Sequence, residues 1–324
     1  MNSIQDAGLE DSRFPNVRKE VQKIASQKAG PLLDRAEAVE LETDPRWAIV
    51  RVSVGNLRFQ PRHHAELGTQ VLLGTVLKVL REHGSWFYVQ SPDQYLGWIE
   101  GSTVVVGDSE LAQRWLAGER LIVTELQDRL MDKPDKLSFP VSDVVAGCLL
   151  HDAGHAEGWN RLRLPDGRIG YMRQGQVVNF ERWKKTIKAS PENLERVARS
   201  LMGLPYLWGG TSTKSVDCSG FTKTVYLLNG IQLNRDATHQ SLQGEEVMPG
   251  ADFQNLQKGD LLFFGKKAAA KRGEEITHVA MYLDQRVYIH SSGMVRLNSL
   301  DPQSPLFDEE RLKTFIRARR ILAM

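Results

Sequence analysis

The sequence predicts a multidomain chain in which two small all-β barrels precede an α+β domain. Three observations support this fold class. Residues 45–180 contain an internal repeat at a constant offset, and each copy alternates short β-rich runs with turn residues. The last stretch of about 130 residues runs helix, glycine-rich turn, helix and then strands. A chain of 324 residues has room for two or three domains of roughly 100–200 residues each.

The composition excludes several classes of protein. Its 41% apolar and 25% charged residues are ordinary for a soluble chain, and a formal net charge of +2 gives no reason to expect nucleic-acid binding. Two cysteines in 324 residues exclude a scaffold built on disulfides. No apolar run approaches the roughly 20 residues needed to cross a bilayer, so we expect no membrane span.

The first residues raise an expectation about localisation without deciding it. Residues 1–11 lack the basic and apolar regions of a signal peptide. We therefore expect a cytoplasmic protein if residue 1 is the native start, and a periplasmic or extracellular one if a signal peptide was removed. Within the N-terminal segment 1–44, apolar residues at helical spacing predict a short amphipathic helix over 16–26.

Framework residues carry the internal repeat. The matched positions, all related by the same offset, include Leu57 with Leu130, Gly74 with Gly147, Trp86 with Trp159, Pro92-Asp93 with Pro165-Asp166, and Gly97-Trp98-Ile99 with Gly170-Tyr171-Met172. Self-similarity at a fixed period without gaps indicates two copies of one structural unit. We place the two copies at 45–110 and 111–182, and each has the strand and turn pattern of a small barrel.

The repeat also accounts for the second cysteine. Cys148 aligns with Thr75 in the strand after the shared glycine, so we expect a small buried core residue rather than a partner for Cys218. His151 and His155 lie on the hairpin of the second copy and lack the glutamate of a zinc-binding HExxH helix. The sequence therefore predicts no metal site and no cofactor.

Residues 190–324 form the predicted α+β domain, which follows a basic connector at 181–190. Ser190 has the position of a helix N-cap and Pro191 that of the first helical residue. A second helix is expected over about 218–229. Strands are expected at 260–265, 277–283, 286–291 and 314–319, with a turn at 284–286.

Cys218 is the candidate nucleophile of this domain. It begins an apolar-periodic helix, where unpaired N–H groups and the helix dipole favour thiolate over thiol. His278 and His290 lie on consecutive predicted strands, so an antiparallel hairpin can bring them together. One imidazole would then accept the thiol proton while the other holds its tautomer. Taken singly, a buried histidine is more often a core residue than a catalyst.

The order of motifs in 191–324 resembles the NlpC-type cysteine peptidase family. The resemblance rests on PYLWGGT at 205–211, DCSGF at 217–221, KGDLLFF at 258–264 and THVAMY at 277–282. It implies a papain-like α+β fold with a catalytic triad. By this resemblance Cys218 is the nucleophile, His278 the base and His290 the third member, with Tyr206 beside the thiol.

The signature of the two copies, Trp-x-x-apolar followed by Gly-aromatic-apolar, resembles bacterial SH3-type domains. SH3-type domains ahead of this catalytic domain, with Leu57-Arg58 and Ala65-Glu66-Leu67 in the first, are similar to γ-D-glutamyl-L-diamino acid endopeptidases. The resemblance implies cleavage of peptidoglycan stem peptides between D-Glu and the diamino acid, lysine or meso-diaminopimelate. It further implies a free N-terminal L-Ala on the peptide, and a role in murein peptide recycling or cell-wall turnover.

The same resemblance implies a set of substrate-binding residues. Glu66 and Asp236 would receive the L-Ala ammonium, and Tyr95 of the first copy would line the cleft. A buried carboxylate makes strong charge-assisted hydrogen bonds to an ammonium and is left unpaired by an acylated amine. The full set is Glu66, Tyr95, Tyr206, Trp208, Asp217, Ser219 and Asp236, with Asp217 and Ser219 near the D-Glu group.

The repeat offers a separate hint about two of these residues. Glu66 corresponds to Phe139 and Tyr95 to Arg168, so the copies share their framework but differ at these positions. The alternative is that Glu66 and Tyr95 are ordinary solvated loop residues.

Two other functions stay open at this point. The chain could be another Cys/His amidase that acts on the intact cell wall, or a catalytically inactive wall-binding protein. The presence of Cys218, His278 and His290 together argues against the inactive protein. The sequence does not choose between lysine and diaminopimelate, gives no oligomeric state, and leaves the charged loop at 266–275 without a role.

Overall fold

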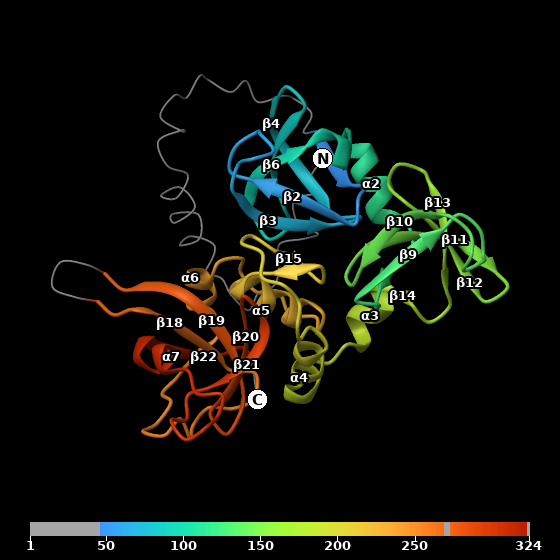
Figure 1. Cartoon of the computed structure of the whole chain (residues 1–324). Coiled ribbons are helices and arrows are strands. Elements are labelled where there is room, and N and C mark those ends of the chain that lie inside the picture. The colour runs from blue at the N-terminus through green and yellow to red at the C-terminus, as the bar shows by residue number, and fades with distance from the viewer. Residues whose placement is uncertain (1–45, 269–272, 323–324) are drawn as a thin grey trace. The chain divides into compact units, whose positions relative to one another are not determined.

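Four β-sheets, one of them a two-stranded hairpin, form the framework of residues 46–268 and 273–322, which the computed structural model describes (Figure 1). The described residues from Arg46 onward belong to one compact unit. The predicted segment 1–44 and its helix over 16–26 lie outside the described residues. Among the described residues, no helix is both long and apolar enough to cross a membrane.

The first sheet has seven antiparallel strands in the order β3-β2-β6-β5-β4-β1-β7. Its interior is made of fully buried apolar side chains such as Leu57, Val89 and Ile99. The strands are β1 (Trp47–Val50), β2 (Val54–Arg58), β3 (Leu67–Leu72), β4 (Val76–His83), β5 (Trp86–Gln90), β6 (Leu96–Glu100) and β7 (Val104–Gly107), with the 3-10 turn η1 (Gly101–Thr103) before the last.

The second sheet repeats the strand order of the first, as β10-β9-β13-β12-β11-β8-β14. The register repeats as well, because Leu57 pairs with Thr69 while their equivalents in the second copy, Leu130 and Ser142, pair with each other. The duplication in the sequence is therefore a duplication of fold. The strands are β8 (Arg120–Val123), β9 (Gln127–Met131), β10 (Pro140–Val145), β11 (Leu149–Ala156), β12 (Trp159–Arg163), β13 (Ile169–Arg173) and β14 (Val177–Asn179).

The second cysteine is a core residue, as predicted. Cys148 is fully buried in the second sheet, where its Sγ accepts a hydrogen bond from Val145 N at 3.4 Å. The two histidines of this sheet have protein partners. His151 stacks on the Trp115 ring at 3.9 Å between centroids, and His155 Nδ1 lies 3.1 Å from Asn160 Oδ1. The described residues hold no group of three or more His, Cys, Asp or Glu side chains suited to a metal ion.

Two short helices accompany the seven-stranded sheets, α2 against strands β1 and β7 of the first and α3 against β8 and β14 of the second, and the sequence predicted neither. The first, α2 (Ser109–Ala117), begins where the Asp108 side chain accepts from Leu111 N. The second, α3 (Phe180–Thr186), occupies much of the predicted connector 181–190, so that part of the prediction was wrong. The Asn179 side chain caps α3 by accepting from Arg182 N, which supplies the local start signal.

The third domain combines a six-stranded antiparallel sheet, order β17-β22-β18-β19-β20-β21, with four helices. The four predicted strands are confirmed, and so is the Ser190 cap, whose Oγ accepts from Asn193 N at 3.2 Å. Strands β17 and β21 and the helices α6 and α7 were missed. The elements are α4 (Pro191–Ser200), β15 (Thr211–Ser212), β16 (Ser215–Val216), α5 (Cys218–Leu227), α6 (Ala237–Gln240), β17 (Glu245–Val247), β18 (Leu261–Lys266), β19 (Glu275–Asp284), β20 (Val287–Ser292), β21 (Met294–Ser299), α7 (Glu309–Thr314) and β22 (Phe315–Arg320).

The central strands β18 and β19 are buried on both faces over most of their length, which is why they contain continuous apolar runs in the sequence. Leu261 and Phe263 of β18 pack with α4 and α5, while Leu262 and Phe264 pack into a second core on the other face. The predicted turn between β19 and β20 is confirmed. The backbone there is left-handed, with φ of 48° at Gln285 and 64° at Arg286, as tight hairpins require.

Two equivalent glycines allow the strands of each seven-stranded sheet to approach closely. A Cβ on Gly97 would lie 2.9 Å from Leu57 Cβ, and a Cβ on Gly170 would lie 2.7 Å from Leu130 Cβ. Both leucines are fully buried, so they cannot move aside without disturbing the core.

We expect Gly97→Ala and Gly170→Ala each to lower the free energy of unfolding by about 1–3 kcal/mol, because each overpacks a fully buried leucine. Chemical denaturation followed by circular dichroism measures the effect. Gly273→Ala is the control, since a Cβ there meets no atom within 4 Å, and it should stay within about 0.5 kcal/mol of wild type. Equal stability of all three variants would contradict the overpacking, and a loss in only one of the two sheets would contradict their equivalence.

Candidate active site

Cys218 is the first residue of α5, where the sequence places it, and its side chain is buried. Asp217 caps the helix by accepting from Gly220 N at 2.7 Å and also accepts from Gly209 N at 2.9 Å. The preceding loop packs tightly against this first turn, because a Cβ on Gly220 would lie only 1.9 Å from Gly210 O. The start of the helix is therefore fixed by its own cap and by the glycine-rich loop.

The electrostatics at the thiol differ from the prediction. Burial, and after it the neighbouring Asp217 carboxylate, raise the pKa of Cys218 to about 11. The backbone N–H groups of Val279 and Ser219 and the Arg235 guanidinium act in the opposite direction. The N–H group of Ser219 at the helix start does favour the thiolate, as predicted, but desolvation and the capping carboxylate outweigh it, so the net pKa is raised.

The two histidines meet in the interior, as the hairpin argument predicted. His278 Nε2 lies 2.8 Å from His290 Nδ1, with the rings at 88° to each other, and both side chains are buried. Burial lowers the pKa of His278 well below its ordinary value, with Arg311 and His290 adding to the effect. Burial likewise lowers the pKa of His290 to about 4. Both imidazoles are therefore neutral at pH 7.

Asn298 on β21, which the sequence analysis did not single out, determines which ring nitrogen of each histidine carries the proton. Its Nδ2 donates to Leu306 O at 3.3 Å, so its Oδ1 faces His290 Nε2 at 3.1 Å. His290 must then carry its proton on Nε2 and accept at Nδ1 from the Nε2–H of His278. The lone pair of His278 consequently sits on Nδ1. The only signal in the sequence was a polar amide within an otherwise strand-like run.

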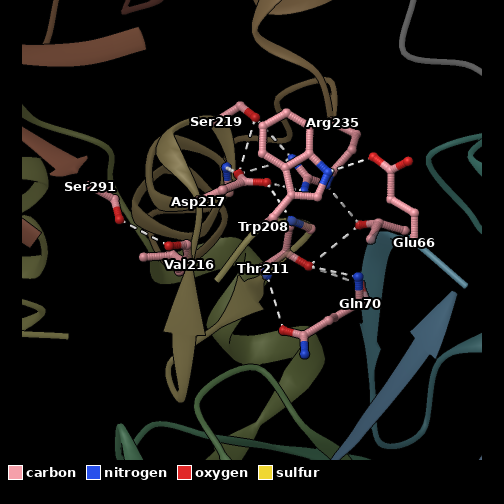
Figure 2. A network of polar contacts seen from close by, with 12 residues as sticks. Glu66, Gln70, Trp208, Thr211, Val216, Asp217, Ser219, Arg235 and Ser291 are labelled. Carbon is pink, nitrogen blue, oxygen red and sulfur yellow. Dashed lines mark hydrogen bonds and ion pairs between the residues drawn. The ribbon is translucent and has the colours of Figure 1, made fainter. Parts of the chain in front are cut away.

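Figure 2 shows a second feature that sequence reasoning missed, a buried ion pair at the base of α5. Arg235 Nη2 lies 2.5 Å from Asp217 Oδ2, and its Nη1 donates to Ser219 Oγ at 2.9 Å. Its Nε donates to Thr69 Oγ1 in the first sheet at 3.1 Å. The pair thus joins the helix cap to a different domain.

Glu66, an exposed residue in the loop directly before β3, lies near the loop that precedes the thiol helix. Glu66 Oε1 accepts a hydrogen bond from Trp208 Nε1 at 2.8 Å, and the Trp208 side chain is 61% exposed (Figure 2). Burial raises the pKa of Tyr95, and the nearby Asp236 carboxylate raises it further. Burial also raises the pKa of Tyr206, with Cys218 next in effect. Tyr95 therefore lies within electrostatic reach of Asp236, and Tyr206 within reach of Cys218, while Figure 2 shows Glu66 and Trp208 near Asp217 and Arg235.

Two other predicted substrate residues are already engaged within the protein. Asp217 is buried and binds Arg235 and two backbone N–H groups, while Ser219 Oγ lies between Asp217 and Arg235. Their direct contact with a D-Glu group stays a prediction. The structure shows that both side chains support the helix start.

Comparison with known proteins agrees with this architecture. Residues 203–315 match the model of the NlpC/P60 family, and residues 57–104 match that of the bacterial dipeptidyl-peptidase Sh3 domain. The chain is 31% identical to dipeptidyl-peptidase 6 of Lysinibacillus sphaericus over 82% of its own length and 96% of that relative. It is 30% identical to a gamma-D-glutamyl-L-lysine dipeptidyl-peptidase of Bacillus cereus, over 79% of this chain and 76% of the relative.

Among solved structures, an NlpC/P60 family protein from Bacillus cereus is similar to this chain with a TM-score of 0.70 and 27% identity. The similarity covers 86% of this chain and 100% of that one. The protein therefore belongs to the NlpC/P60 family of cysteine peptidases, with an SH3-like all-β region ahead of the peptidase domain.

We expect alkylation of Cys218 by iodoacetamide in the substrate-free protein to keep accelerating as pH rises through 9, because burial holds the thiol protonated up to a pKa of about 11. Mass spectrometry of the 218 peptide at successive pH values measures the rate, and buried Cys148 in the same sample serves as the internal control. A rate that levels off below pH 8 would show a preformed thiolate and contradict the expectation.

Proposed function

We propose that this protein hydrolyses the γ-D-glutamyl–L-diamino acid bond of peptidoglycan stem peptides that carry a free N-terminal L-Ala. The diamino acid is lysine or meso-diaminopimelate, and the setting is murein peptide recycling or cell-wall turnover. The observation that carries the proposal is the position of Glu66, an acidic side chain of the SH3-like region that is held by Trp208 of the peptidase domain. Two relatives named gamma-D-glutamyl-L-lysine dipeptidyl-peptidase support the same bond.

In this mechanism Cys218 attacks the γ-carbonyl carbon of the D-glutamyl group. His278 Nδ1 takes the thiol proton as the carbon–sulfur bond forms, since both groups are neutral at rest. The backbone N–H of Cys218 at the helix start stabilises the oxyanion. The imidazolium then protonates the departing amine of the diamino acid. A water molecule that is deprotonated by His278 hydrolyses the thioester and restores the thiol.

His290 acts on this reaction through His278. Its Nδ1 accepts the Nε2–H of His278 at 2.8 Å, which keeps the lone pair on Nδ1, and it stabilises the imidazolium that forms during attack. Cys218 is one of the groups that raise the pKa of Tyr206, so the two side chains are close, and we assign Tyr206 to the wall of the site.

Recognition of the free amine is assigned to carboxylates from two domains. Glu66 comes from the SH3-like region, whereas Asp236 precedes α6 in the peptidase domain, and Tyr95 lies within the electrostatic reach of Asp236. An ammonium held by two carboxylates gains charge-assisted hydrogen bonds that a neutral acetamide cannot make. We further propose that the second sheet is a second SH3-like barrel, on the strength of its shared strand order and register.

We expect L-Ala-γ-D-Glu-L-Lys, or its diaminopimelate analogue, to be cleaved after D-Glu, and N-acetylation of the L-Ala to lower kcat/KM on the order of 10³-fold. Liquid chromatography with mass spectrometry measures both rates. Cys218→Ala should abolish cleavage, and Glu66→Gln should reduce the discrimination against the acetylated peptide. Equal cleavage of the two peptides would overturn amine recognition.

Intact sacculi test the two alternative functions. Release of peptides from intact sacculi would favour the wall amidase, and binding without cleavage would favour the inactive wall-binding protein.

We expect Asn298→Leu to lower kcat about 10–100-fold with KM within about twofold, because His290 loses the acceptor that sets its tautomer. Asn298→Asp keeps an acceptor at that position and should retain more activity, with the acidic limb of the pH–rate profile moved to higher pH, since a carboxylate favours the imidazolium. Steady-state kinetics over pH 5–9 provide the measurement. Two variants with wild-type profiles would remove Asn298 from the proton chain.

A further inference from the structure

The two-stranded hairpin β15–β16, residues 211–216, runs directly into the Cys218 helix and contacts both seven-stranded sheets. Thr211 pairs with Val216 and Ser212 with Ser215, which leaves Thr213 and Lys214 at the tip. Apart from Lys214 and Ser215, its residues are buried. No residue of this hairpin takes part in the proposed catalytic steps, so its many hydrogen bonds to the two sheets need another explanation.

The first sheet holds the base of the hairpin through Gln70 on β3 (Figure 2). Thr211 Oγ1 donates to Gln70 O at 3.0 Å and accepts from Gln70 N at 3.1 Å. The Gln70 Oε1 accepts from Thr211 N at 3.1 Å and from Ser212 Oγ at 3.0 Å. The amide is kept in this orientation because its Nε2 donates to Asn56 Oδ1 at 3.1 Å.

The second sheet holds the tip of the hairpin. Gln127 Nε2 on β9 donates to Thr213 O at 2.6 Å, and Thr213 Oγ1 donates to Leu126 O. Lys214 Nζ forms an ion pair with Asp143 on β10. The same Nζ donates to Ser53 Oγ of the first sheet at 3.0 Å, so one lysine of the peptidase domain joins both sheets.

The two sheets use equivalent positions for these contacts. Gln70 and Asp143 are related by the offset of the repeat, and so are Ser53 and Leu126. Both members of each pair contact the hairpin. Equivalent surfaces of the two sheets thus contact the hairpin from two sides. The hairpin covers the same surface in each copy of the repeat.

The other end of the hairpin is tied to the reacting groups. Val216 is fully buried in the same core as Cys218, two residues before it in the chain. Val216 O accepts from Ser291 Oγ at 2.9 Å, and Ser291 follows His290 on β20 (Figure 2). A shift of the hairpin would therefore move the start of α5 relative to the histidine strand.

We propose that the two seven-stranded sheets act as a clamp on the 211–216 hairpin, and that this clamp positions Cys218 against His278. The positioning residues are then Lys214, Gln127 and Asp143. The surface of the second sheet that contacts the hairpin supports catalysis and does not bind the cell wall. The inference rests on the proposed function insofar as Cys218 is its nucleophile. Its physical basis is that a misplacement of about 1 Å can cost on the order of 100-fold in rate.

The test compares four full-length variants with wild type. Lys214→Met removes the ion pair and the Ser53 contact, while Gln127→Ala removes the donor to Thr213 O. The double variant Lys214→Asp with Asp143→Lys restores an ion pair of reversed sign. Lys184→Met is the matched control, because Lys184 has a similar side-chain exposure (46% against 42% for Lys214) and pairs with Glu181 away from the hairpin. The readouts are kcat and KM on the free peptide, the iodoacetamide alkylation rate of Cys218 without substrate, and the thermal melting temperature.

We expect Lys214→Met and Gln127→Ala to lower kcat about tenfold, with KM within about twofold and a changed alkylation rate. The charge-reversed double variant should recover most of kcat, and Lys184→Met should match wild type. Variants that melt earlier but keep wild-type kcat and alkylation would overturn the clamp. If wild type cleaves none of the peptides, the proposed function fails, whereas the alkylation rates still decide the clamp on their own.

Discussion

The buried ion pair between Asp217 and Arg235 is the interaction on which the arrangement of the site depends. Asp217 caps the helix that begins with Cys218, holds the glycine-rich loop through Gly209 N, and binds Arg235. Arg235 in turn reaches Thr69 of the first sheet. Removing one partner of such a pair leaves a buried charge without a partner, at a cost of about 3–5 kcal/mol. The helix start, the glycine-rich loop and the first sheet are therefore held in place together.

The same ion pair shapes the reactivity of the thiol. A carboxylate next to Cys218 disfavours the thiolate, and the Arg235 guanidinium offsets only part of that effect. Burial also keeps His278 and His290 neutral. The resting site therefore holds a thiol and an imidazole whose lone pair is directed by a chain of hydrogen bonds ending at Asn298 and the Leu306 carbonyl. The reacting groups themselves are thus uncharged at rest, and the buried charges beside them are paired with each other.

The duplicated sheets show how one fold has diverged around a shared framework. Glu66, in the loop before β3, accepts a hydrogen bond from Trp208, whereas its counterpart in the second copy is an apolar residue, Phe139. Tyr95 lies in the field of Asp236, whereas its counterpart Arg168 donates to Arg51 O and so links the two sheets. The copies keep the leucine and glycine positions that set strand order, and they differ where each sheet meets the rest of the molecule.

The sequence by itself determined the repeat, the Cys218 helix and the four main strands of the peptidase domain, because these depend on local patterns. The leucines and glycines that recur at one fixed offset predicted two equivalent β units, and the apolar period after the glycine-rich turn placed Cys218 at a helix start. Two histidines on consecutive predicted strands indicated that a hairpin can bring them together, and the structure confirms the contact. Tertiary structure alone decided the protonation of the thiol, the role of Asn298, and the contacts of Arg235 with Thr69 and of Gln70 with Thr211. Those features depend on contacts between residues far apart in the sequence or on burial. Neither a long-range contact nor burial of a single polar group produces a periodic pattern in the sequence.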